Sequence, residues 1–415
     1  MFNKILFGAL GGCLLASSAW AQVVEATRPP LTLKAAVAEA IDRHPDLRSL
    51  RARVEAAESA STRERYLMPP MLETQIWSWP VTTLNPARTD MYMFMAEQEL
   101  PGKGKRDARA LVVQRDAEIV RQQIPVHALE LLGEAREAFV DLSLARQVRG
   151  LYEGQRGLVR EMTEAATLRY AAGEGGQHHS VASLAELTRL ERDVIAADER
   201  VQRAELRLNA ALARPLMQPV ESLSPIDVSY SRADAERIAL DRHPEFRVVD
   251  AMVAREEAEL ARLQGERRPD FVVGGGYMLM PGEAGALTVR AGVSWPNAPW
   301  SRGRLAAELD TQTRRIAAAK TQREAVSLRV RRAVGEAGIR MLAAERQVQL
   351  LESTVLPQAE HAFELARVAY SGGQGNFLDL LESRRLLFAT EVELAEARAS
   401  VSRAVVDLET AMGIQ

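Results

Sequence analysis

The sequence has little cysteine, few aromatic residues and almost no net charge, and each shortage excludes a class of protein. Its single cysteine, Cys13, excludes a disulfide framework and a cysteine-rich metal centre. Aromatic residues make up only 5% of the 415 residues, which is low for an ordinary enzyme core. The formal net charge of −3 provides no basic surface for nucleic acid. A mean hydropathy of −0.16 leaves no room for several membrane helices.

Common catalytic motifs are also missing. The sequence contains no His-Glu-x-x-His, no Gly-x-Ser-x-Gly and no phosphate loop. The segment 102–105 (Gly-Lys-Gly-Lys) lacks both the glycine spacing and the serine or threonine of a nucleotide site. These absences favour a protein that is not an enzyme and binds no cofactor.

Residues 1–21 have the pattern of a secretory signal peptide. Lys4 provides the positive start, residues 5–16 are an apolar stretch, and Ala19-Trp20-Ala21 is a small-x-small cleavage site. One alternative stays open, because residues 10–13 (Leu-Gly-Gly-Cys) resemble a lipobox, which would make Cys13 a lipidated N-terminus. Either interpretation predicts export across the inner membrane.

The chain contains an internal duplication. Residues 40–48 (Ala-Ile-Asp-Arg-His-Pro-Asp-Leu-Arg) return as residues 239–247 (Ala-Leu-Asp-Arg-His-Pro-Glu-Phe-Arg), an offset of 199. The Tyr-x-x-Gly motif at Tyr170 returns at Tyr370, an offset of 200. We therefore predict a first structural repeat over residues 22–229 and a second over residues 230–415.

Long helices are expected in both repeats. Residues 101–170 contain one interior proline, Pro125, and as a helix would be about 105 Å long, which suits a tube rather than a globular core. A heptad pattern of large and small residues predicts a coiled-coil seam. Its members are Leu187, Val194, Val201 and Leu208 with Leu190, Ala197, Ala204 and Ala211, and in the second repeat Leu387, Leu394, Val401 and Leu408 with Thr390, Ala397, Ala404 and Ala411.

Four stretches have the period of β-strands instead. They cover about residues 70–79, 91–100, 270–280 and 286–295, and in the last of them apolar residues alternate with polar ones. Four of the five tryptophans, Trp77, Trp79, Trp295 and Trp300, lie in or beside these stretches. Strands of about ten residues with aromatic residues near their ends are typical of an outer-membrane barrel. Since the smallest such barrels have eight strands, several copies of the chain would have to share one.

The ordered set of these features resembles the outer-membrane efflux channel family typified by TolC. The resemblance rests on four features: the tandem repeat, the Asp-Arg-His-Pro segments, the strand exits at 101–106 and 296–304, and the Ala-Met-Gly ending at 411–413. The length is similar to that of the heavy-metal branch, the CzcC-like and CusC-like channels.

The resemblance implies a mainly α fold with a small β part. Three copies would form an α-barrel of long coiled-coil helices in the periplasm and a shared 12-stranded β-barrel in the outer-membrane lipid, four strands from each chain. The homotrimer would dock onto a periplasmic adaptor (a membrane fusion protein) and an inner-membrane proton-driven pump.

The resemblance also points to an aperture just after the second Tyr-x-x-Gly motif. The family places acidic residues on the inner face there, which makes Asp379 and Glu382, with Tyr370 at the motif, the aperture candidates. The two acids are three residues apart and share a helix face. The first repeat has no aspartate at the matching place, so only the second repeat is expected to carry the ring.

Two groups of residues are candidate metal ligands. Met91, Met93 and Met95 share one face of the second strand, and Met278 and Met280 share one face of the third. Thioether sulfur is a soft ligand that suits Cu(I), although methionine is also a common packing residue. His178 and His179, in a glycine-rich turn, form the second group.

Two alternatives to a metal efflux duct remain open at this point. One is a duct for type I protein secretion or for drug efflux. The other is a periplasmic coiled-coil structural or adaptor protein without a pore, against which the four aromatic-flanked strands argue.

Overall fold

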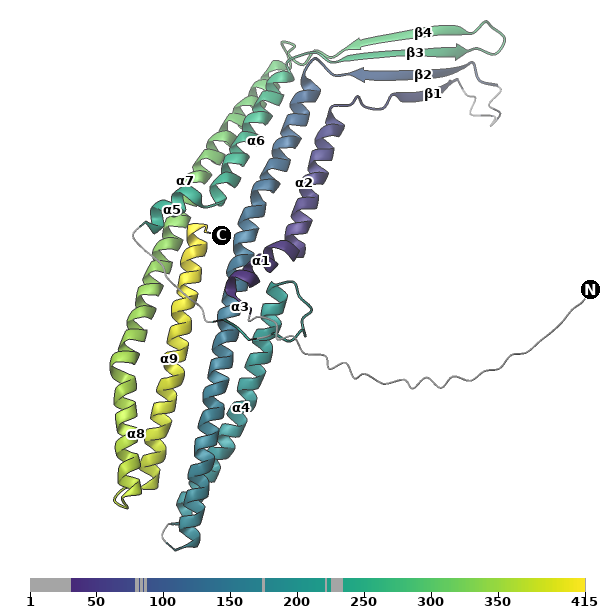
Figure 1. The fold of residues 1–415 in the computed structure, drawn as a ribbon. Helices are drawn as coiled ribbons and strands as arrows, with labels where there is room; N and C mark the ends of the chain where they lie inside the picture. Colours follow the sequence, from purple (N-terminus) through teal and green to yellow (C-terminus); the bar gives the residue numbers. More distant parts are fainter. Residues whose placement is uncertain are drawn as a thin grey trace, which may run out of the picture.

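Long helices run side by side beneath a small antiparallel sheet in the computed structural model of the protein (Figure 1). The structure describes residues 31–78, 82, 85, 88–173, 176–220, 222–224 and 234–414. The predicted signal peptide with Cys13, and the boundary between residues 229 and 230, lie outside the described residues.

The same order of elements occurs in the two halves of the chain. The first half contains α1 (Leu33–Arg43), α2 (Pro45–Glu64), β1 (Met71–Trp77), β2 (Met91–Leu100), α3 (Lys105–Ala171) and α4 (Gln177–Ala211). The second half contains α5 (Ala235–Arg242), α6 (Glu245–Gly265), β3 (Phe271–Leu279), β4 (Ala286–Val293), α7 (Arg302–Leu350), a π-helix (Leu351–Val355), α8 (Leu356–Ser371) and α9 (Phe377–Met412). The fold is thus mainly α with a small β part.

A His-Pro pair separates the short helix from the next helix in each half. The imidazole of His44 accepts a hydrogen bond from the Asp46 N–H at 3.3 Å, and the imidazole of His243 accepts one from the Glu245 N–H at 3.4 Å. Proline forces the residue before it out of the helical region and fits the first turn of the helix that follows. The chain therefore leaves the short helix at His44 and at His243 before the next helix begins.

The predicted long helix is α3, which has 67 residues and is therefore about 100 Å long. Pro125 lies inside it without ending it. Helix α4 packs along α3, and α9 packs against α3 and α7. Most of the predicted heptad residues are buried along these contacts, which confirms the seams; Leu187, Val201, Val401, Ala211 and Ala411 are half-buried.

The second half departs from a continuous helix. A five-residue π-helix, Leu351–Val355, separates α7 from α8, and Pro357 follows it in the first turn of α8. Proline has no N–H for the carbonyl four residues earlier, so the widened turn accommodates this lost hydrogen bond. The two long arms are therefore built differently: α3 is unbroken, whereas its counterpart has a local irregularity.

The four strands form one sheet in the order β1-β2-β3-β4, with every neighbouring pair antiparallel. They are two or three residues shorter than predicted, except β2, which has the predicted bounds. Trp295 follows β4, and its ring meets the ring of Trp300 edge-on at 5.8 Å. Trp79 lies outside the described residues.

No helix in the described part of the chain combines the length and the hydropathy needed to cross a membrane.

Candidate functional site

The two faces of the sheet differ in chemistry. Directly opposed residues of antiparallel strands point to the same side, so the register assigns every strand residue to a face. One face is almost entirely apolar and exposed, and we call it the apolar face. Its large members are Leu72, Ile76, Tyr92, Phe94, Phe271, Val273, Tyr277, Leu279, Leu287, Val289 and Val293.

The opposite side, which we call the methionine face, carries polar residues and methionines. Met93 lies opposite Met278, and Met95 lies opposite Gly276. The polar members are Glu73, Gln75, Glu97, Glu99, Thr288 and Arg290, and Trp77 and Val272 lie on the same face. Met91, Met93, Met95 and Met278 thus share one face as predicted, while Met280 lies one residue beyond β3.

Glycines in β3 make room for the side chains of β2 on this face. A Cβ on Gly276 would lie 2.9 Å from the Met95 Cγ, and a Cβ on Gly274 would lie 2.9 Å from the Glu97 Cγ. Across Gly274 the guanidinium of Arg290 donates to the Glu97 carboxylate at 2.6 Å. The side chains of Met95 and Glu97 therefore lie across β3.

Sequence reasoning missed one methionine of this face. Met71 of β1 lies opposite Glu97, on the same side as Glu73 and Gln75. The alternation of Leu72 and Ile76 with polar residues along β1 was the signal that could have placed it.

A buried lysine joins the sheet to the helices. The side chain of Lys105, the first residue of α3, is only 1% exposed. Its ammonium lies 2.7 Å from the Asp270 carboxylate and 2.9 Å from the Glu266 carboxylate. Asp270 also accepts a hydrogen bond from the Gly102 N–H at 2.7 Å. This cluster connects the exit of β2 with the entry to β3, and sequence analysis treated Lys105 only as part of an exit motif.

The ends of α3, α4, α8 and α9 that lie far from the sheet form the tip of the molecule (Figure 1). Phe377 and Leu381 of α9 are buried against Ala166 of α3. The Tyr370 ring meets the Phe377 ring at 5.7 Å, and the Arg169 guanidinium lies 4.5 Å from the centre of the Tyr370 ring. Tyr370 therefore connects the tips of the two halves.

An ion pair makes a second connection at the tip. The guanidinium of Arg385 on α9 donates to the buried carboxylate of Glu186 on α4 at 2.5 Å. The same guanidinium lies 3.3 Å from Glu382, one turn away on its own helix. Asp379 and Glu382 are exposed on one face of α9, away from the buried Phe377 and Leu381. The two predicted acids thus lie on the first turns of α9 beside a cation, Arg385, and a buried acid, Glu186, that the sequence pattern did not reveal.

The two neighbouring histidines also lie at the tip. His178 and His179 belong to the first turn of α4, not to a loop as predicted, because α4 begins at Gln177. Their ring centres are 4.1 Å apart, and His179 also lies against Phe377. Burial and the neighbouring His178 lower the pKa of His179. Within the described ranges no three His, Cys, Asp or Glu residues are grouped so as to hold a metal ion.

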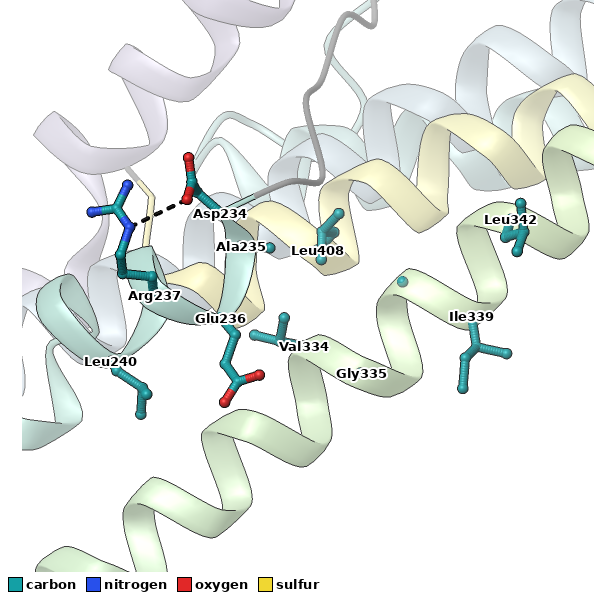
Figure 2. A pocket seen from close by; sticks show the side chains of 11 residues that line it. Asp234, Ala235, Glu236, Arg237, Leu240, Val334, Gly335, Ile339, Leu342 and Leu408 are labelled. Carbon is teal, nitrogen blue, oxygen red and sulfur yellow. Dashed lines mark hydrogen bonds and ion pairs between the residues drawn. The ribbon is translucent and has the colours of Figure 1, made fainter.

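A groove of about 700 Å³ lies between α5 and α7 (Figure 2). Leu240, Val334 and Leu408 line it, and an ion pair between Asp234 and Arg237 lies at its rim. At Gly338 of α7 a Cβ would meet nothing within 4 Å. The equivalent position of the first half, 199 residues earlier, is the fully buried Phe139. The groove is lined mostly by apolar side chains, with the charged groups of Asp234, Glu236 and Arg237 at one side.

Known proteins resemble this chain in sequence and in fold. Residues 237–414 match the family model described as outer membrane efflux protein. The second half of the chain is thus similar to the outer membrane efflux protein family. The cobalt-zinc-cadmium resistance protein CzcC of Cupriavidus metallidurans is 24% identical over 386 residues, covering 92% of this chain and 90% of that protein.

Solved structures share the fold. The outer membrane protein VceC of Vibrio cholerae matches with a TM-score of 0.71 at 15% identity, covering 92% of this chain and 96% of that chain. CusC, the subject of a structural study of transmembrane channel formation, matches with a TM-score of 0.71 at 17% identity, covering 92% of both chains.

Proposed function

We propose that this protein is the outer-membrane channel of a tripartite efflux system that exports heavy-metal cations. The observation that carries the proposal is the sheet with one apolar and one polar face at the end of a helix about 100 Å long. That division of faces suits a sheet with lipid on one side and water on the other. The metal substrate rests on the similarity to CzcC, a cobalt-zinc-cadmium resistance protein.

A homotrimer follows from the number of strands. Four strands cannot close a barrel, whereas three chains together would supply twelve. Large apolar side chains are exposed along both outer helices of the chain, on α4 and on α7. Examples are Val181 and Ile195 on α4, and Leu328 and Ile339 on α7. Packing of α4 from one copy against α7 of the next would cover both sets.

The tip would be the closed end of the duct. Three copies of Asp379 and Glu382 would form a ring of six carboxylates, an arrangement that favours cations. The tip would dock onto a periplasmic adaptor, and an inner-membrane proton-driven pump would supply the free energy, because the duct carries no energy source of its own.

Two experiments test the proposal, and the first concerns the substrate. Deletion of the gene from a strain that retains its pump and adaptor should lower tolerance to cobalt, zinc and cadmium, and the wild-type gene should restore it. Unchanged tolerance to all three metals would exclude them as substrates.

The second experiment tests which face of the sheet meets lipid, with two neighbouring residues of β4. Val289 is 87% exposed on the apolar face, while Thr288 belongs to the methionine face. A lysine on the lipid side costs about 2–4 kcal/mol near the bilayer centre. Val289→Lys should therefore remove the trimer from the outer-membrane fraction, and the control Thr288→Lys should leave it there. Equal behaviour of the two variants would contradict the assignment of the faces.

A further inference from the structure

We infer that the methionine face is a binding surface for soft monovalent metal ions, Cu(I) and Ag(I). The inference rests on the proposed function, since it takes this face to line the pore. These monovalent ions are a different class of substrate from the cobalt, zinc and cadmium that the name of CzcC gives.

The distribution of methionine between the two faces carries the inference. Six of the thirteen methionines of the chain lie on the methionine face or directly beside it, and the apolar face has none. The six are Met71, Met91, Met93, Met95, Met278 and Met280. Methionine used only as adaptable filler would be expected on the apolar face as well.

The register places these thioethers side by side. Directly opposed residues have Cβ atoms about 4.5–5.5 Å apart, so Met93 and Met278 present two thioethers to the same region. Met91 and Met95 are the next residues of that face along β2, and the glycine at 276 leaves room for the Met95 side chain over β3. An ion would thus meet several thioethers within a small area.

The carboxylates next to these methionines are already engaged. The Glu73 carboxylate, opposite Met95, accepts a hydrogen bond from the Gln75 amide at 2.6 Å, and the Glu97 carboxylate accepts one from Arg290 at 2.6 Å. The ligands left on offer are thioether sulfurs, which select soft ions such as Cu(I), and we extend this preference to Ag(I). Several weak sites in series suit conduction, because an ion held tightly at one site would not leave.

Silver binding to the purified trimer in detergent tests the inference. Silver nitrate is titrated into protein that carries ¹³C-methyl methionine, and the methyl resonances are followed. We expect Ag(I) to shift resonances of the wild type, and the shifts to disappear when all six methionines are replaced by leucine. The control M68L/M217L/M252L removes three exposed methionines elsewhere and should keep the shifts. Zinc should shift neither protein.

Because a thioether has no proton to lose, the silver-induced shifts should be the same at pH 5.5 and pH 8. Leucine preserves methionine's volume closely, so the variants should still form trimers. If the sixfold variant does not, M93L/M95L/M278L serves instead and should lose most of the shift. Silver shifts that survive in the methionine-face variant, or vanish equally in the control, would overturn the inference.

The titration measures binding without export, so its result is independent of the tolerance test of the proposed function. A channel that confers cobalt, zinc and cadmium tolerance but shows no silver-induced shift would retain the proposed function and lose the inferred site.

Discussion

The ion pair between Glu186 and Arg385 should hold the tip closed. It connects α4 with α9, which have few other contacts with each other, so separation of the two hairpins at the tip would break it. The perturbation is Glu186→Gln, which keeps the shape of the side chain and an acceptor oxygen but removes the charge.

The size of the effect follows from the exposure of the two partners. The Glu186 side chain is 3% exposed and that of Arg385 is 38% exposed. A hydrogen bond to a charged partner contributes about 1.5–3 kcal/mol, and a neutral one about 0.5–1.5 kcal/mol. Since solvent screens the partly exposed Arg385, we take the lower end of each range, which gives a loss of about 1 kcal/mol. That difference shifts the ratio of open to closed channels roughly fivefold.

Single-channel recording in planar bilayers measures this ratio as an open probability. We expect it to rise about fivefold in Glu186→Gln. The control is Glu382→Gln, because Glu382 pairs with the same guanidinium from its own helix and its side chain is 75% exposed. That variant should leave the open probability near the wild-type value. An unchanged open probability in Glu186→Gln, or equal effects of the two variants, would refute the role of the pair in closure.

Three further predictions concern stability and selectivity. Lys105→Met leaves the carboxylates of Glu266 and Asp270 without their cation, so it should lower the free energy of unfolding by about 3 kcal/mol, measured as a lower melting temperature. The control Lys103→Met, at an exposed position, should leave the melting temperature unchanged. Burial lowers the pKa of His243; the charge of Glu245 opposes this shift and the charge of Arg329 adds to it. The stability that neutral His243 contributes is therefore complete above about pH 6.5 and is lost as the pH falls through the lowered pKa. His243→Asn, which can still cap α6, should therefore reduce the loss of melting temperature between pH 7 and pH 5, and an identical loss would contradict this. Asp379→Asn with Glu382→Gln should reduce cation selectivity in planar bilayers while the trimer stays intact, and unchanged selectivity would remove both residues from the aperture.

Local patterns in the sequence determined most of the fold. The helix breaks at His44 and His243 depend on adjacent prolines, and the seams depend on residues seven positions apart. The faces of the strands depend on alternation, so the methionines of β2 could be assigned to one side before the pairing was known. Each of these features is set by neighbours within one or two turns of the chain.

The tertiary structure alone decided which charged groups meet. Lys105 is 165 residues from Asp270, Arg290 is 193 residues from Glu97, and Arg385 is 199 residues from Glu186. Charged residues are so frequent in the sequence that any of them has many possible partners, and only the packing of the two halves selects one. The same packing buries Lys105 and Glu186, and burial is what makes their pairs strong enough to matter.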